Sequence, residues 1–164
     1  MGMTVVGRIL SEEQAAEVLR DPSTANDLAI DEAEGDEATD DWLSLDKAWQ
    51  GVHFLLTGTV DATPEPLGQA VLGGQEVGED DGYGPPRLMD PATVAEVATA
   101  LSGLTDDEVR ARFDTRTMQA MDVYPQIWDE DNVLEDYLMP FVQALREFYA
   151  RASHRGAAVL LAVQ

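Results

Sequence analysis

The chain has 164 residues, 45% of them hydrophobic, which suffices for one hydrophobic core without covalent cross-links. It contains no cysteine, and this excludes disulfide bonds, thiolate metal sites and a cysteine nucleophile. Its 32 acidic and 10 basic residues give a formal net charge of −22, so its surface repels phosphate backbones and disfavours direct binding to nucleic acid or to an anionic membrane.

The negative charge has two interpretations. It can steer a basic protein partner toward the surface, or it can be the solvated surface of a protein from a salt-adapted or high-GC bacterium. The N-terminal residues lack the basic flank and long apolar run of a signal peptide. The longest apolar run, from Ala157 to Val163, is far shorter than the roughly 20 residues that span a membrane. We therefore expect a soluble cytoplasmic protein that forms a single domain over residues 1–164.

The first predicted elements are a strand over residues 1–10 and a helix over residues 11–20. Residues with branched β-carbons favour the strand, and Ser11 with Gln14 forms a capping box at the start of the helix. Residues 27–41 are rich in Asp and Glu and contain no basic residue. Mutual repulsion disfavours tight packing there, so we predict an exposed acidic loop or a frayed helix.

A further helix is predicted over residues 45–57. Its apolar positions recur at spacings of four, three and four, and they are Leu45, Trp49, Val52 and Leu56. Gly58 then provides the left-handed residue that commonly follows a helix.

The remainder of the chain alternates between helices and short loops. The predicted helices cover residues 66–72, 91–103, 105–113, 114–121 and 132–153. A brief strand is expected near residues 75–77, inside a loop over residues 74–86 that is rich in Gly and Pro. Pro140 lies inside the longest helix, where its missing N–H predicts a kink. Residues 157–163 are apolar on both faces, which is typical of a buried central strand.

Four stretches of this sequence match a known family. They are residues 1–3 (MGM), 45–58 (LDKAWQGVHFLLTG), 66–74 (PLGQAVLGG) and 123–128 (VYPQIW). With the closing helix and strand in matching order, the chain resembles the YfbM-like family of bacterial proteins, domain of unknown function 1877. The resemblance implies an α+β fold: a helix-rich three-layer α-β-α sandwich around a small mixed sheet. It implies no activity, so no catalytic residue is transferred from it.

One candidate site lies on the predicted helix of residues 45–57. Asp46, Trp49 and His53 lie at offsets of zero, three and seven, so on a helix they share one face, together with Gln50. The carboxylate and the imidazole can then act as a base and its orienting group, or hold a polar ligand against the indole. Alternatively Asp46 caps the helix, Trp49 lies in the core and His53 is hydrogen-bonded and half-buried. We favour the second interpretation, because a cap alone explains an aspartate at this position.

A second candidate set combines aromatic residues with an arginine in or beside loops rich in Gly and Pro. Its members are Tyr83, Arg87, Tyr124 and Trp128. These residue types anchor many interfaces, which indicates a pocket or a partner-binding patch. Aromatic residues also dominate core packing, so the same side chains can close the rim of the core.

Cofactor-binding motifs are absent from the sequence. The two histidines, His53 and His154, do not form a metal-binding pattern, and we expect no transition-metal site; the acidic residues leave open only a loosely held magnesium or calcium ion. The sequence contains neither a glycine-rich phosphate loop nor a Gly-x-Ser-x-Gly motif. We therefore expect no nucleotide cofactor.

The leading functional hypothesis is a non-enzymatic module that binds a protein or a small polar ligand. The expected binding face is aromatic and comprises Trp49, Tyr83, Tyr124 and Trp128. One version is an inhibitor of a basic partner, in which carboxylates imitate phosphate. The alternative is a small-molecule enzyme that uses Asp46 and His53, and a third hypothesis is a purely structural domain. The sequence makes no prediction of oligomeric state.

Overall fold

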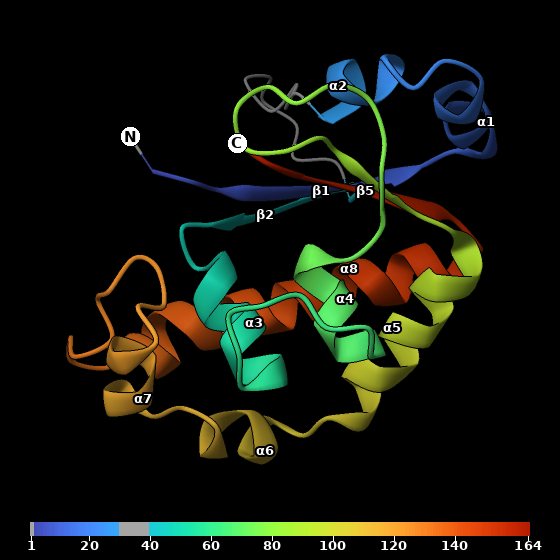
Figure 1. Cartoon of the computed structure of the whole chain (residues 1–164). Helices are drawn as coiled ribbons and strands as arrows, with labels where there is room; N and C mark the ends of the chain where they lie inside the picture. The colour runs from blue at the N-terminus through green and yellow to red at the C-terminus, as the bar shows by residue number, and fades with distance from the viewer. Residues whose placement is uncertain (1, 30–39) are drawn as a thin grey trace.

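The centre of the fold is a five-stranded sheet in the order β2-β1-β5-β4-β3 (Figure 1). The computed structural model describes residues 2–29 and 40–164. The strands are β1 (Val5–Leu10), β2 (Trp42–Asp46), β3 (Gln75–Glu76), β4 (Arg87–Met89) and β5 (Ala158–Val163). Each of the four strand pairs is antiparallel, so the expected mixed sheet is wrong in this detail.

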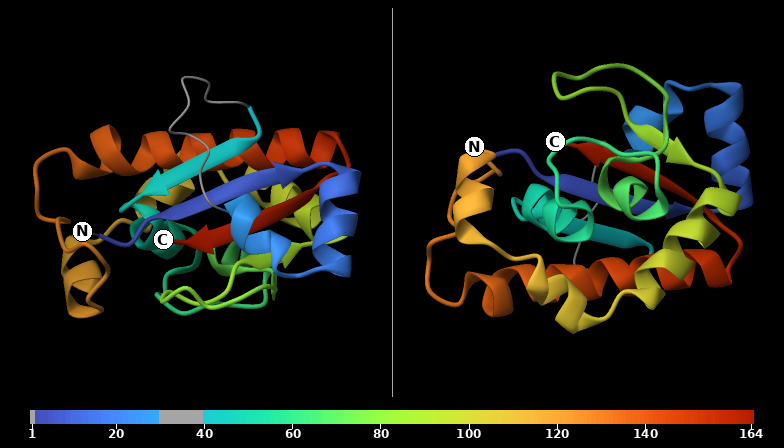
Figure 2. Two further views of the ribbon diagram at one scale, coloured as in Figure 1. Left: turned by 90° about the horizontal axis from the view of Figure 1, so that it is seen from above. Right: turned by 60° about the horizontal axis from the view of Figure 1, so that its bottom comes forward.

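The direction of β5 explains the antiparallel arrangement. Helix α8 (Met139–His154) runs along the sheet in the direction of β1, and the chain then reverses at Gly156, which has a φ of 61° (Figure 2). The returning strand therefore enters opposite to β1. The two strands pair along their whole length, from Val5 opposite Val163 to Leu10 opposite Ala158.

Helices cover both faces of the sheet and form the outer layers (Figure 1). One face carries α1 (Glu12–Arg20) and α2 (Thr24–Ala29). The other face carries α3 (Trp49–Thr57), α4 (Pro66–Leu72), α5 (Pro91–Gly103) and α8. Beyond them on the same side lie α6 (Asp106–Ala111) and α7 (Thr115–Ala120). This arrangement confirms the predicted α+β class and the three layers.

The two faces of the sheet support hydrophobic cores of very different size. The larger core lies on the α3–α8 side and contains the bulkiest buried side chains, Trp128, Phe148 and Tyr149. The smaller core lies under α1 and α2, where the buried residues are Val6, Leu10, Val18, Ala25, Ala29, Leu160 and Ala162. The thin layer over the smaller core leaves Leu19 of α1 72% exposed.

Four local capping signals in the sequence, unlike the one expected at Asp46, predict helix starts correctly. Capping boxes form at Ser11 with Gln14 and at Thr105 with Glu108. Asp90 caps α5, and Asp114 caps α7 in the same way, by accepting hydrogen bonds from backbone amides. These signals depend on neighbouring residues only, so tertiary packing does not change them.

The structure corrects the predicted helix over residues 45–57. Leu45 and Asp46 end strand β2, and the helix begins only at Trp49. In β2 the buried side chains of Leu43 and Leu45 alternate with exposed ones, and Asp46 then takes a positive φ of 46°. Leu45 at the end of the strand is buried in the same core as the residues of α3. Because Leu45 and Trp49 are both buried there, their spacing resembled that of one helix. The end of the helix at Gly58, with a φ of 78°, is as predicted.

Besides β2, two further elements were not predicted. Residues 24–29 form α2, which buries Ala25 and Ala29, whereas the sequence from Asp27 onward indicated an exposed loop or a frayed helix. Residues 87–89 form β4 directly after a loop rich in Gly and Pro. Of the predicted acidic loop over residues 27–41, the first three residues belong to α2, and residues 30–39 lie outside the described residues.

The irregularity expected at Pro140 takes the form of a π-helical turn over Leu134–Leu138. The backbone N–H of Met139 donates to the carbonyl of Leu134, five residues earlier. Pro140 lies in the first turn of α8, directly after the π-helical turn, and the first turn of a helix is a common position for proline.

Substitution of Gly51 by alanine tests the packing of α3 against the larger core. An added β-carbon would lie 2.5 Å from Trp128 and 2.9 Å from Leu138, both buried. We expect Gly51→Ala to lower the free energy of unfolding by about 1–3 kcal/mol, measured by urea denaturation. Gly103→Ala is the matched control, because no atom lies within 4 Å of the new β-carbon. It should leave stability unchanged or raise it by up to about 1 kcal/mol.

Candidate functional site

Asp46 and His53 do not form the expected pair on one helical face. Asp46 lies at the end of β2, and its carboxylate accepts a hydrogen bond from the Tyr137 hydroxyl at 3.4 Å. The N-cap residue of α3 is Ala48 and not Asp46, as was expected, and Ala48 makes no side-chain capping hydrogen bond. His53 lies on α3 and is fully buried, rather than half-buried as expected.

The contacts of His53 are structural. Its Nε2 atom lies 2.8 Å from the carbonyl oxygen of Asp61, whereas Nδ1 has no hydrogen-bond partner among the described residues. Loss of hydration on burial lowers the pKa of His53. The hydrogen bond to the Asp61 backbone and the negative charge of Asp61 both raise it, but by less. The imidazole is therefore neutral, and its Nε2–H ties the loop after α3 to the helix.

Trp49 and Tyr124 hold the beginning of the chain. The indole N–H of Trp49 donates to the carbonyl of Met3 at 3.1 Å, and the amide of Met3 donates to the Tyr124 hydroxyl at 3.1 Å. The two rings lie 6.2 Å apart between centroids. The amide of Tyr124 donates to the side chain of Gln50 at 2.6 Å, so both aromatic residues are engaged in contacts within the chain.

Trp128 and Arg87 also serve the fold. Trp128 is 1% exposed, and its indole N–H donates to the carbonyl of Val123 at 2.7 Å. Arg87 lies at the start of β4, beside the Gly- and Pro-rich loop, and its guanidinium donates to the carbonyls of Val71 and Gly73 at the end of α4. Burial lowers the pKa of Arg87. These contacts satisfy backbone groups that α4 leaves unpaired.

Tyr83 is separated from the other aromatic residues. It is 52% exposed, on the loop that joins β3 to β4. Asn26 of α2 anchors this loop through hydrogen bonds to the backbone of Glu79 and to the carboxylate of Asp81, each at 2.8 Å. The loop therefore attaches to the layer opposite α3, and the four aromatic residues do not share the expected face.

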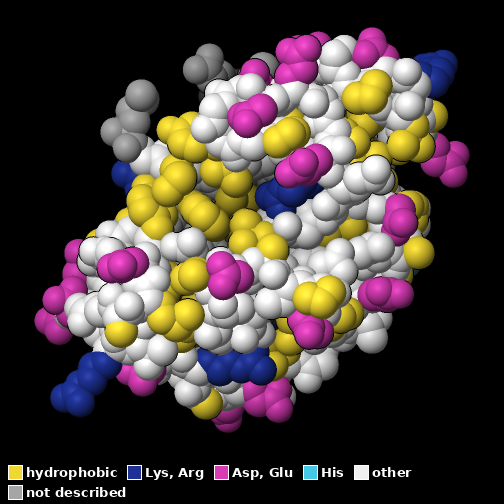
Figure 3. All heavy atoms as spheres, viewed as in Figure 1, with side chains coloured by type: hydrophobic (Ala, Val, Ile, Leu, Met, Phe, Trp, Pro, Cys, Tyr) yellow, Lys and Arg dark blue, Asp and Glu magenta, His cyan; other side chains and the backbone are white. Residues whose placement is uncertain are grey.

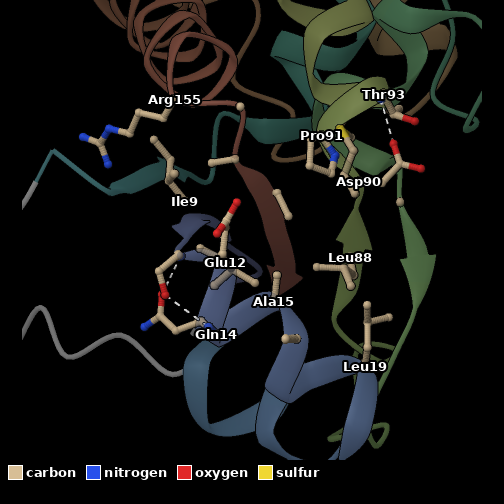
Figure 4. A pocket seen from close by; sticks show the side chains of 18 of the residues that line it. Ile9, Glu12, Gln14, Ala15, Leu19, Leu88, Asp90, Pro91, Thr93 and Arg155 are labelled. Atoms are coloured by element: carbon tan, nitrogen blue, oxygen red, sulfur yellow. Dashed lines mark hydrogen bonds between the residues drawn. The ribbon is translucent and has the colours of Figure 1, made fainter.

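A cleft of about 980 Å³ lies at the end of the sheet where β1 ends and β5 begins (Figure 4). Its walls come mainly from α1, the ends of β1 and β4, the start of α5, and the turn between α8 and β5. Single residues from neighbouring segments complete the lining: Asp41, Gln69, Gly74 and Gln75. None of the sequence-predicted site residues lines it.

The two ends of the cleft differ in chemistry (Figure 4). Ala15, Leu19 and Leu88 form an apolar end, which continues the smaller hydrophobic core to the surface. The polar end carries the carboxylates of Glu12, Asp41 and Asp90 and the guanidinium of Arg155.

The polar end has an excess of negative charge. Arg155 forms an ion pair with Asp41. Hydrogen bonds from the backbone and side chain of Thr93 lower the pKa of Asp90, so its carboxylate is ionised at neutral pH. Glu12 takes part in none of the ion pairs among the described residues.

The face that α1 presents to the cleft follows helical spacing. Glu12, Ala15, Ala16 and Leu19 lie at offsets of zero, three, four and seven and all line the cleft. Sequence reasoning missed this face because alanines carry a weak hydrophobic signal. The one usable signal was Leu19, a second large apolar residue directly after the core residue Val18.

Comparison with known proteins identifies the family. The family described as "Domain of unknown function (DUF1877)" matches residues 1–162. The chain belongs to the DUF1877 family. Protein YfbM of Escherichia coli strain K12 is 34% identical over 88 residues, and the match spans only about half of that relative, 52% of each chain.

A solved structure supports the same assignment. The crystal structure of YfbM from Escherichia coli, a protein of unknown function, is similar to this DUF1877 chain with a TM-score of 0.74 and 25% identity. The superposition covers 98% of this chain and 99% of that one. The expected YfbM-like resemblance is confirmed.

Two features are absent from the described residues. No helix over residues 2–29 or 40–164 is both long and apolar enough to cross a membrane. Within the same ranges, no group of three or more His, Cys, Asp and Glu side chains is placed to hold a metal ion.

The burial of His53 predicts a pH-dependent stability. Because folding lowers its pKa below the ordinary value of 6.5, the unfolded chain binds the proton more readily. With respect to His53, the free energy of unfolding should therefore be at its maximum above about pH 7. It should fall as the pH drops below 6.5, by at most about 1.4 kcal/mol per pH unit.

Urea denaturation between about pH 7.5 and pH 5.5 measures this slope, and the window stays above the range in which most carboxylates titrate. His53→Gln should remove most of the slope, whereas His154→Gln, at an exposed position, should retain it. Equal slopes in the wild type and His53→Gln would contradict the assignment of a neutral buried imidazole.

Proposed function

We propose that this DUF1877 protein is a non-enzymatic binding module whose site is the cleft between α1 and the start of α5. The observation that carries the proposal is the polarity of the cleft, with Leu19 and Leu88 at one end and Glu12 and Asp90 at the other. A ligand that fits both ends combines an apolar group with a positive charge.

The two ends contribute differently to binding. Burial of a leucine side chain contributes about 1.5–3 kcal/mol, and Leu19 is 72% exposed in the free protein. A solvent-exposed ion pair contributes about 0–1 kcal/mol. The apolar end therefore supplies most of the affinity, and the carboxylates select for cationic ligands and increase the rate of association.

The surface around the cleft favours the same class of ligand. Carboxylates are distributed across the face shown in Figure 3, and the net charge of the chain is −22. Such a field raises the local concentration of cations and lowers that of anions. An inhibitor of a basic protein is one form of such a module.

The geometry gives no support to the alternative of an enzyme that uses Asp46 and His53. His53 is fully buried, Asp46 bonds to Tyr137, and neither residue lines the cleft. A base and its orienting group must reach a substrate within hydrogen-bond distance, and these two side chains do not share an accessible space.

Titration with n-octylammonium, followed by NMR, tests the proposal with a minimal ligand. We expect saturable shifts at the amides of Ala15, Leu19 and Leu88, and binding of octanoate that is weaker by about fivefold or more. Glu12→Gln should weaken octylammonium binding by up to about fivefold, because it removes a carboxylate from the polar end.

Glu17→Gln is the matched control for this measurement. It removes the same charge from the same helix, but Glu17 is exposed and does not line the cleft, so binding should be unchanged. The proposal would be contradicted if octanoate bound as tightly as octylammonium, or if the NMR shifts were spread evenly over the surface.

A further inference from the structure

We infer that the natural occupant of the cleft is a basic amphipathic helix of a partner protein, packed against the cleft-facing side of α1. The inference rests on the proposed function, because it names the class of ligand for the same site. It follows from the shape of α1, the incomplete helical layer, the short sheet edge and the charge of the chain.

The exposed face of α1 suits contact with another helix. Ala15 and Ala16 are small, so a second helix can approach closely, and Leu19 projects beside them as an apolar side chain for interdigitation. Helices pack at interaxial distances of about 8–10 Å, and small residues at the contact allow the lower values.

The layer that contains α1 is incomplete. α1 and α2 bury Leu10 of β1 and Leu160 of β5, on two inner strands of the sheet, whereas Leu88 on β4 is only half-buried. A third helix beside α1 would cover Leu88 and Leu19 and extend the smaller core. The cleft is therefore a continuation of a helix–sheet interface that already exists in the fold.

An extended peptide is a poorer fit than a helix. The sheet edge beside the cleft is β3, which has two residues, both exposed. Recognition by strand addition needs a longer run of unpaired backbone groups. A helix makes its own backbone hydrogen bonds and needs only an apolar surface.

The charge of the chain decides between a partner and a second copy. Two copies would bring together surfaces that each carry a net charge of −22, and the carboxylates of Glu12 and Asp90 would face like charges. A partner helix with Lys or Arg beside its apolar stripe would instead place positive charges opposite these carboxylates. Its cationic residues would lie toward Glu12, and its apolar residues toward Leu19.

A synthetic helical peptide tests this inference directly. The probe has about 15 residues, a side-chain staple on its solvent face, Leu at helical spacing and Lys at the remaining positions. We expect it to bind the full chain with NMR shifts at Ala15, Ala16 and Leu19. A proline-interrupted peptide of the same composition and a Glu-for-Lys version should each bind at least about tenfold more weakly by fluorescence anisotropy.

Ala16→Trp should weaken binding of the peptide by at least about tenfold, because the indole occupies the space of the incoming helix. Ala16 is exposed, so the fold should tolerate the substitution, and the thermal midpoint checks this. Glu17→Trp adds the same side chain on the other side of α1 and should leave binding of the peptide near the wild-type value.

The outcomes separate the inference from the proposed function. If octylammonium binds in the cleft but the helical peptide does not, the helix is wrong and the binding module stands. If the proline-interrupted peptide binds equally well, a helical conformation is not required for binding and the inference fails. If neither probe produces shifts in the cleft, both proposals fail.

Discussion

The antiparallel pairing of β1 with β5 is the contact on which the rest of the structure depends. It joins residues 5–10 to residues 158–163 and places the two ends of the chain in the middle of the sheet. Alternate residues of β5 serve opposite cores: Val159 and Leu161 face the larger one, and Leu160 and Ala162 face the smaller one. Because the central strand is apolar on both faces, helices must cover both, and three layers follow. The pairing also sets Leu10 beside Ala158 at the end of the sheet, where the cleft forms.

The parts of this fold that could be predicted are those determined by neighbouring residues. Caps at Ser11, Asp90 and Thr105 depend on side chains within one turn, and the apolar run of β5 identifies a central strand by itself. Leu45 shows where such reasoning fails. It is buried in the same core as α3, so its spacing to Trp49 fits a helix, yet the chain between them turns sharply at Asp46. Periodicity records which residues are buried, and two consecutive elements that bury residues in one core can imitate a single helix.

The same limit applies to the candidate site. Trp49, Trp128 and Arg87 are residue types that anchor interfaces, but here each donates to backbone carbonyls left free by loops or helix ends. A side chain with an apolar body and one hydrogen-bond donor at its tip can anchor an interface or satisfy a buried carbonyl within the fold. Its residue type therefore does not distinguish the two roles. The cleft, by contrast, is assembled from residues near 12–19, 88–91 and 155–158, which only the sheet topology brings together. Its residue types are unremarkable one by one, and their placement alone makes the site.

The unequal cores separate the main source of stability from the cleft for which we propose a binding role. The larger core, with Trp128, Phe148 and Tyr149, buries most of the bulky side chains and so supplies most of the hydrophobic stabilisation. The smaller core is built mainly from alanine, valine and leucine under two short helices, and its border remains open at Leu19. A surface that must accept a partner has to leave apolar area uncovered, which costs stability in the free protein. A fold that holds its sheet from the opposite face can tolerate that cost, because the strands beneath the cleft also bury Ile9, Met89 and Val159 in the larger core.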